Sequence, residues 1–225
     1  MTFLVTVYTH EAIVMAADSR TTFNNTAHYS DTAQKLFLTK SGVGISFCGV
    51  ADVNGHLIQE HIESFCESNN SKTVRSTVTE FDKMCQNVGI GPKSTFYFAG
   101  YDVSKGGKKQ VVMKYIPTQD PVPVNIAPGA SWDGQTDIIS RLFAPVFLKR
   151  TNDKGEDIFI PHQAFDTNFD LFTAQDAIDF AMTSMEIVKG MLRLQNRQVN
   201  VGGPVDMLLI TPKEAKWLAK KELHI

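Results

Sequence analysis

The 225-residue sequence has few cysteines, no long hydrophobic run and no excess of charge of either sign. Its three cysteines, Cys48, Cys66 and Cys85, are odd in number and lack CxxC spacing, which argues against a disulfide framework and a zinc ribbon. No apolar run approaches the roughly 20 residues that cross a bilayer. The 22 basic and 24 acidic residues form no basic patch of the kind that binds nucleic acid. We therefore expect no membrane partner and no nucleic-acid partner.

The opening segment MTFLVTVYTHE carries no basic residue before its apolar stretch, so it does not resemble a secretion signal. Together with the reduced thiols that the cysteine pattern favours, this predicts a cytoplasmic protein. Hydrophobic residues make up 43% of the chain, which is enough to bury a sizeable core. We expect a single domain over residues 1–225.

Short apolar runs bounded by turn residues predict strands. These runs cover residues 3–8, 12–17, 35–39, 43–48, 95–100, 110–115 and 205–210. Apolar residues at helical spacing predict helices after Asp52, from 74 to a stop at Gly89, from 134 towards 145, and after Thr173. Thr211 followed by Pro212 resembles the start of a further, C-terminal helix.

The polar segment from Lys149 to Phe169 has no helical period, and we interpret it as a surface insertion at about 149–170. Strand pairs in blocks, alternating with pairs of helices, predict an α+β fold in which helices pack on antiparallel sheets.

Three segments resemble one known family. They are AIVMAADSRTT (12–22), AQKLFLT (33–39) and GISFCGVADVNG (44–55), and they look like the second strand, the lysine-bearing strand and the Gly-rich strand end of proteasome β subunits and the bacterial HslV peptidase. The resemblance is sharp over the first quarter of the chain. It implies the N-terminal nucleophile hydrolase fold, a four-layer α-β-β-α sandwich of two antiparallel sheets flanked by helices.

In that family the nucleophile is an N-terminal threonine, which the resemblance places at Thr2 after removal of Met1. The chemistry is reasonable because a hydroxyl needs an adjacent base, and the α-amine of an N-terminal residue has a pKa near about 8. The resemblance implies that Lys35 adds positive charge beside the amine and that Asp18 holds this lysine. It also implies that the N–H of Gly49 points at the oxyanion of the tetrahedral intermediate.

The outer part of the site departs from the family pattern. The family has a catalytic serine in a Gly-Ser-Gly element close to the threonine amine, and Ser131 in PGAS (128–131) is the nearest match, one position late, so the resemblance implies Ser131 as a catalytic residue near the Thr2 amine. An aspartate and a serine that normally precede a Gly-Gly pair are Gln198 and Val201 here. The run from Val201 to Asp206 leans towards divergent bacterial relatives such as the Anbu group.

The resemblance also suggests a substrate and an assembly. It places five uncharged residues around the primary specificity pocket, namely Thr21, Ala33, Phe37, Phe47 and Ala51. We expect peptide or unfolded protein as substrate, cleaved after small or medium neutral side chains, with no cofactor and no metal. The implied particle is a homo-oligomeric ring, for which an unfoldase ATPase is a candidate partner.

Other interpretations stay open. Each site residue taken alone could be an ordinary strand or turn residue, and Cys48 is more simply a small buried side chain than a nucleophile. His56 and His61 flank Glu60, but their spacing does not match a zinc protease motif. A non-catalytic ring or scaffold subunit and a small-molecule amide hydrolase of the same fold are the two remaining alternatives.

Overall fold

Two five-stranded sheets face each other in the computed structural model, which describes residues 2–22, 28–143, 145–162 and 167–222. All strand pairs within them are antiparallel. The first sheet contains, in spatial order, β12 (Gly129–Gly134), β1 (Phe3–Tyr8), β2 (Ile13–Asp18), β15 (Val205–Ile210) and β16 (Ala215–Ala219). The second contains β11 (Val122–Pro123), β10 (Gly107–Tyr115), β9 (Thr95–Ser104), β6 (Gly44–Cys48) and β5 (Leu36–Leu38).

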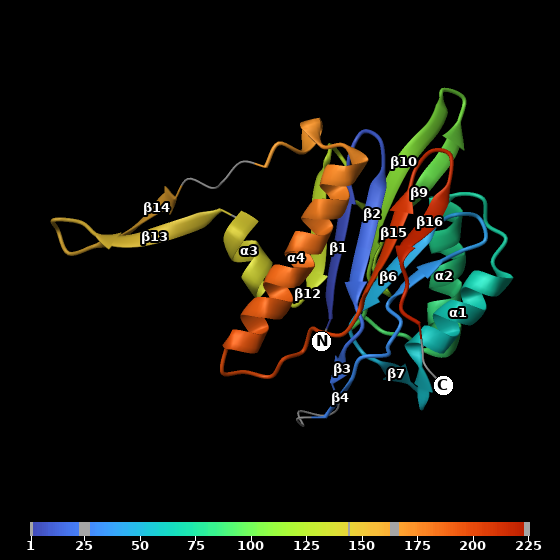
Figure 1. Cartoon of the computed structure of the whole chain (residues 1–225), viewed down its shortest axis with the longest axis horizontal. Coiled ribbons are helices and arrows are strands. Elements are labelled where there is room, and N and C mark those ends of the chain that lie inside the picture. The colour runs from blue at the N-terminus through green and yellow to red at the C-terminus, as the bar shows by residue number, and fades with distance from the viewer. Residues whose placement is uncertain (1, 23–27, 144, 163–166, 223–225) are drawn as a thin grey trace.

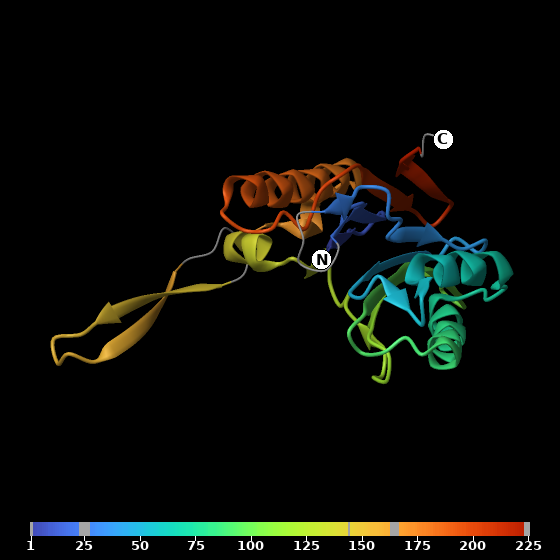
Figure 2. The same ribbon diagram turned by 90° about the horizontal axis from the view of Figure 1, so that it is seen from below.

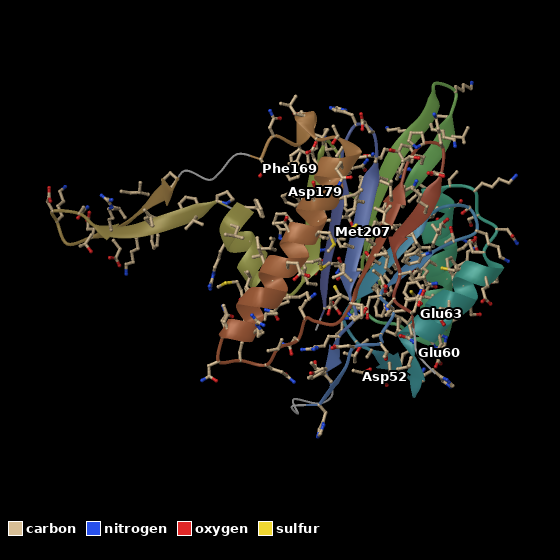
Figure 3. All side chains as sticks on the ribbon, in the orientation of Figure 1. Asp52, Glu60, Glu63, Phe169, Asp179 and Met207 are labelled. Carbon is tan, nitrogen blue, oxygen red and sulfur yellow. The ribbon has the colours of Figure 1, made fainter. Side chains whose placement is uncertain are left out.

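Helices cover the outer faces of both sheets (Figures 1 and 2). α3 (Asp137–Phe143) and α4 (Ala174–Leu194) lie on the first sheet, whereas α1 (Ile58–Ser68) and α2 (Val74–Val88) lie on the second. The charged side chains of Asp179 on α4 and Glu60 on α1 mark the two opposite outer surfaces, and Met207 lies between them (Figure 3). The α-β-β-α sandwich expected from the sequence is confirmed. None of the described helices has the length and apolar composition of a membrane-spanning segment.

Every residue of β1 and β2 is buried, because these strands are covered on both faces. Side chains alternate along a strand, so Val14 and Ala16 pack under α4 while Ile13 and Met15 face the second sheet. The layer between the sheets is therefore apolar along most of its length. The candidate site lies at one end of this layer, where β2 ends at Asp18.

The predicted ends of two helices are confirmed. Thr173 caps α4 and forms a capping box with Asp176, and α2 stops at Gly89, whose φ of 87° is the left-handed conformation that glycine adopts easily. Thr73 forms a further capping box with Ser76 at the start of α2.

The predicted start of the first helix after Asp52 was wrong. A small hairpin of β7 (Asp52–Val53) and β8 (His56–Leu57) comes first, and α1 begins only at Ile58. Its turn is Asn54-Gly55, with φ values of 52° and 82°. Asn-Gly is the strongest short hairpin signal, and here it outweighs the helical spacing that follows.

The predicted C-terminal helix was also wrong. Thr211 does accept hydrogen bonds from following backbone N–H groups, as a cap would, with Glu214 N at 3.1 Å. However, Thr211 N also donates to Glu214 O at 2.8 Å, which closes a tight turn. The chain then runs back along β15 as β16 and packs Trp217 against the layer between the sheets.

The region around the third helix differs from the prediction in two ways. Residues 129–134 form strand β12, and α3 starts three residues later than expected, at Asp137. The segment interpreted as a surface insertion contains an antiparallel hairpin of β13 (Val146–Thr151) and β14 (Asp157–His162), which projects away from the sandwich (Figures 1 and 2). Whether this segment is an insertion stays a prediction.

Candidate active site

A fully buried carboxylate organises the end of the layer between the sheets. Asp18 Oδ1 accepts hydrogen bonds from Phe3 N at 3.0 Å and from Lys35 Nζ at 2.9 Å. Asp18 Oδ2 accepts from Arg20 N at 3.0 Å and from Gly202 N at 3.1 Å. Both oxygens of Asp18 are therefore hydrogen-bonded, each by two donors, although the residue is 0% exposed.

Lys35 lies just before β5 and reaches across from the second sheet to this carboxylate. Its ammonium also donates to Arg20 O at 2.5 Å. Burial lowers the pKa of Lys35, while the charge of Asp18 and the hydrogen bond to it oppose this effect. The Lys35 nitrogen is thus held by two acceptors and has little contact with water.

Thr2 immediately precedes β1, next to this ion pair. Phe3 N donates to Asp18, which sets the start of the strand, and Thr2 O accepts from Gln135 N at 2.7 Å. Gly134 packs against the Thr2 carbonyl so closely that a β-carbon on it would lie 1.9 Å from Thr2 O. Thr2 is therefore held by backbone contacts on both sides, and only 6% of its surface is exposed.

Thr2 and Lys35 line one pocket of about 500 Å³. The other predicted site residues that line it are Thr21, Ala33, Phe47, Gly49 and Ala51. Phe47 also stacks on Phe96, with ring centroids 6.0 Å apart, so it belongs to both the pocket and the core. Phe37 is 1% exposed in the core beneath and does not appear among the lining residues.

Gly49 occupies a position at which a side chain does not fit. Its φ is 131°, and a β-carbon there would lie 2.3 Å from Lys93 O and 2.6 Å from Ser94 Cα. The glycine lets the chain leave β6 and pass along the pocket without obstructing it.

The structure does not bring Ser131 to this group, which corrects the expectation that it lies near the Thr2 amine. Ser131 pairs with Thr6 in the register of β12 and β1, four positions along the strand from Thr2. Its hydroxyl is 3.0 Å from the hydroxyl of Tyr8. The end of β12 that does reach Thr2 contributes Gly134 and Gln135 instead.

Several charged residues near the site were missed by sequence reasoning. Asp133 Oδ2 forms an ion pair with Lys114 Nζ at 2.6 Å. Asp133 Oδ1 accepts a long hydrogen bond, of 3.7 Å, from Cys48 Sγ, next to Gly49. Asp52, expected only as a helix cap, lines the pocket together with Arg20. No motif links these residues, because their proximity depends on the pairing of strands far apart in the sequence.

The Gly202-Gly203 pair has a direct structural reason. A β-carbon on Gly202 would lie 2.6 Å from Arg20 Cζ, and one on Gly203 would lie 2.8 Å from Asp31 Cβ. Arg20 forms a two-pronged ion pair with Asp31, with both contacts at 2.8 Å, and stacks 3.6 Å from the centre of the Tyr29 ring. The two glycines thus allow this ion pair to pack directly behind Asp18.

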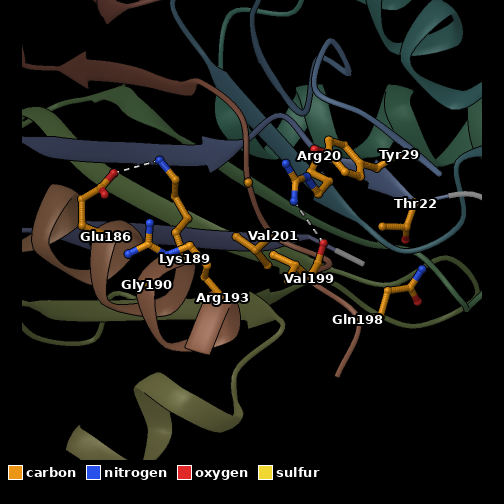
Figure 4. A pocket seen from close by; sticks show the side chains of 11 residues that line it. Arg20, Thr22, Tyr29, Glu186, Lys189, Gly190, Arg193, Gln198, Val199 and Val201 are labelled. Atoms are coloured by element: carbon orange, nitrogen blue, oxygen red, sulfur yellow. Dashed lines mark hydrogen bonds and ion pairs between the residues drawn. The ribbon is translucent and has the colours of Figure 1, made fainter. Parts of the chain in front are cut away.

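A second pocket of about 680 Å³ lies on the other side of Arg20 (Figure 4). Gln198 and Val201, which stand where the resemblance has an aspartate and a serine, both line it. Its far wall is the end of α4, where Glu186 and Lys189 form an ion pair at 2.9 Å. Among the described pockets, Gln198 and Val201 therefore line this second pocket and not that of Thr2.

Among the described residues, no group of three or more His, Cys, Asp or Glu side chains could hold a metal ion. His56 lies in β8 and His61 in α1, with ring centroids 6.0 Å apart, so the two do not share one helix as a zinc protease motif requires. The pocket of Thr2 and Lys35 is also lined by Arg20, Asp52 and Gln59, so it offers a hydroxyl, an amine and further polar side chains as its chemistry.

The chain has the fold of the N-terminal nucleophile hydrolases, and the pocket lined by Thr2 belongs to this fold. Comparison with solved structures makes the likeness specific. Anbu (ancestral β-subunit) from Yersinia bercovieri superposes with a TM-score of 0.61 at 15% identity, covering 98% of this chain and 88% of that one. Anbu from Hyphomicrobium sp. strain MC1 superposes with a TM-score of 0.66 at 13% identity, covering 96% and 87%.

No family model and no curated protein matches the sequence. The assignment by sequence to the proteasome β-subunit and HslV family is therefore corrected. What the comparisons support is a likeness of fold to Anbu proteins, at an identity too low to carry over an activity.

Proposed function

We propose that the chain is a threonine-type amide-bond hydrolase that acts on peptides, with Thr2 as its nucleophile after Met1 is removed. The observation that carries the proposal is the common pocket of Thr2, Lys35 and Gly49, with Lys35 held by buried Asp18. An N-terminal threonine can supply both the hydroxyl and the base, since its own amine takes the hydroxyl proton directly or through one water.

The proposed reaction has two steps. Thr2 Oγ1 attacks the carbonyl carbon of the scissile amide while the Thr2 amine accepts the hydroxyl proton. The tetrahedral intermediate collapses to an ester on Thr2, and the proton passes to the departing amine. Water then attacks the ester carbonyl carbon while the Thr2 amine accepts a proton from it; the bond to Thr2 Oγ1 breaks, the peptide leaves with a free carboxyl group, and the proton returns to Thr2 Oγ1. In its charged form, which Asp18 stabilises, Lys35 favours the neutral amine and the developing alkoxide.

The pocket supports a specificity for neutral side chains. Phe47 and Ala51 line it, and Phe47 rests on the apolar core beneath, which favours an apolar group at the bottom. Asp52 and Gln59 also line it and add polar atoms that the sequence did not predict. We propose that small or medium neutral residues precede the cleaved bond.

The experiment has two parts. Intact mass establishes whether Met1 is removed, and a peptide epoxyketone, which reacts with the hydroxyl and amine of an N-terminal threonine, then tests the nucleophile. We expect labelling and peptide hydrolysis by the wild-type protein and by Thr2→Ser, and neither by Thr2→Ala. Thr6→Val is the matched control, because Thr6 is a buried threonine of the same strand and lines no described pocket. A processed protein that neither takes the label nor hydrolyses a peptide library contradicts the proposal.

A non-catalytic scaffold is the second candidate, and the position of Ser131 favours it. The hydroxyl of Ser131 bonds to Tyr8 and does not line the pocket of Thr2, and neither Gln198 nor Val201 lines it. A scaffold would retain its assembly after Thr2→Ala and show no labelling in the wild type.

We also propose that the protein assembles with copies of itself. The hairpin β13–β14 exposes apolar side chains on both strands, with Phe147 58% and Phe159 66% exposed. An isolated two-stranded hairpin is only marginally stable in water, and apolar patches of this kind usually mark contact surfaces. Sedimentation of the wild-type protein beside Phe147→Ser/Phe159→Ser tests this: we expect a larger particle for the wild type and a monomer for the variant.

A further inference from the structure

The C-terminal segment sends one lysine back into the sandwich. Lys221 follows β16, and its backbone N donates to Asp206 Oδ1 at 2.8 Å while its ammonium pairs with Oδ2 of the same carboxylate. Asp206 is 0% exposed, and the side chain of Lys221 is 6% exposed. This is a second buried Asp–Lys pair, in addition to that of Asp18 and Lys35.

The carboxylates of the two pairs come from neighbouring positions of the first sheet. In the pairing of β15 with β2, Val205 stands opposite Asp18 and Asp206 stands opposite Ala17. Leu208 packs between the sheets, so Asp206, two residues before it, points to the same side. Lys35 enters this layer from the facing sheet, and the charge of Lys221 is close enough to lower the pKa of Lys35.

Stability alone is a poor explanation for this arrangement. Removing two charges from water costs free energy that a buried pair does not always recover, and well-packed apolar residues often do as well or better. Placing one buried ammonium near another adds repulsion to that cost. Charged groups kept close together at such a cost occur preferentially at functional sites.

The groups that act on Lys35 come from three directions. Asp18 approaches from β2, Cys48 from the end of β6, and Lys221 from the C-terminal segment. Burial raises the pKa of Cys48 to about 12, so this thiol is neutral near pH 7. Of these three groups the charged ones are Asp18 and Lys221, which Asp206 holds in place, and Arg20 lines the same pocket as Lys35.

We infer that Lys221, held by Asp206, is a positioning residue of the Thr2 site: it fixes a second buried ammonium behind Lys35 and thereby favours the neutral, proton-accepting form of the Thr2 amine. The inference rests on the proposed function for its catalytic consequence. The placement of Lys221 behind Lys35 can be measured without any hydrolysis.

The primary experiment is a pH titration of Lys35 by NMR in protein with ¹³C-labelled lysine, with the signal assigned through Lys35→Met. In Lys221→Met we expect the Lys35 midpoint to move to higher pH by about half a unit to one unit, since a nearby cation is lost. Lys221→Arg keeps the charge and should leave the midpoint near that of the wild type. Lys216→Met is the matched control, because Lys216 lies on β16 and pairs with Glu214 at the exposed surface.

The same variants are then assayed for the pH dependence of kcat/KM. The limb that rises with pH reports deprotonation of the amine, so in Lys221→Met it should move to higher pH by a similar amount, with kcat/KM several-fold lower on that limb. Asp206→Asn/Lys221→Met removes the pair without leaving a buried anion and covers the case in which the single variant folds poorly. We expect this double variant to move both readouts in the same direction by a smaller amount.

An unchanged Lys35 midpoint in both Lys221→Met and the double variant overturns the inference, whatever the activity. A shifted midpoint with an unshifted kcat/KM profile also overturns it, because Lys221 would then have no influence on the amine. If the Lys35 midpoint shifts in the variants but the processed wild-type protein hydrolyses no peptide, the proposed function is contradicted instead. The two failures are therefore distinguishable.

Discussion

Lys35 and Asp18 form a buried ion pair of 2.9 Å that joins the two sheets of the sandwich next to the pocket of Thr2. The carboxylate ends β2 of the first sheet, and the lysine precedes β5 of the second. The same contact therefore contributes to the closure of the fold and to the electrostatics of Thr2. Variants of this pair are expected to affect stability and activity through separable physical causes.

Lys35→Met should destabilise the protein by about 3–5 kcal/mol, because it leaves the buried Asp18 anion without its cation. Asp18→Asn/Lys35→Met should recover a substantial part of this loss, since no buried charge then remains unpaired. Urea unfolding of the two variants beside the wild type measures the difference. A double variant as unstable as Lys35→Met would contradict the buried-anion explanation. Hydrolysis should be lost in both.

The lowered pKa of Lys35 makes stability depend on pH in a defined direction. In the unfolded chain Lys35 has the higher pKa, so between its folded and unfolded values the unfolded state binds more protons. The free energy of unfolding should therefore rise with pH through that window. The wild type minus Lys35→Met difference, measured by urea unfolding from pH 7 to pH 10, isolates this contribution. A difference that falls with rising pH would mean that the ion pair with Asp18 outweighs burial.

Gly49→Ala should be strongly destabilising and inactive. The new β-carbon would meet Lys93 O at 2.3 Å, and the φ of 131° is unfavourable for alanine, so strain of about 1–3 kcal/mol adds to the clash. Gly91→Ala lies close by in the chain and is the control, because nothing stands within 4 Å of its β-carbon. Thermal unfolding should show a clear loss of Tm for the first variant and almost none for the second. Equal Tm values would show that the chain at Gly49 can move aside.

Ser131→Ala tests whether Ser131 is catalytic, as the sequence suggests, or only bonds to Tyr8, as in the structure. The hydroxyl of Ser131 bonds to Tyr8, so we expect a loss of about 1 kcal/mol in the free energy of unfolding and an unchanged kcat for peptide hydrolysis. A fall in kcat of tenfold or more, without a change in KM, would return Ser131 to the catalytic group. Single-turnover kinetics with a fluorogenic peptide decides the matter.

The sandwich and its inner site could be predicted from local signals. The apolar runs, the Asp18, Lys35 and Gly49 segments and the cap at Thr173 are all contained in short stretches of chain. The errors arose where one short motif has two uses: Thr211 can cap a helix or close a turn, and Asn54-Gly55 forms a hairpin ahead of a helical pattern. Contacts between residues far apart in the sequence could not be predicted from local signals, because they depend on how the strands pair. Examples are the contacts of Ser131 with Tyr8 and of Asp206 with Lys221.

Removal of the β13–β14 hairpin should leave the fold intact and change only the assembly. None of its described residues belongs to the three core clusters, and its strands pair with each other. Replacing residues 146–162 by a short Gly/Ser linker should therefore lower the Tm of the monomer by little, because the loss in buried apolar area is small. Hydrolysis of a short peptide should persist if each subunit carries a complete site, whereas sedimentation should show the monomer. A collapse of Tm in the shortened protein would mean that the hairpin folds back on the sandwich, and loss of peptide hydrolysis by a stable monomer would mean that neighbouring copies complete the pocket.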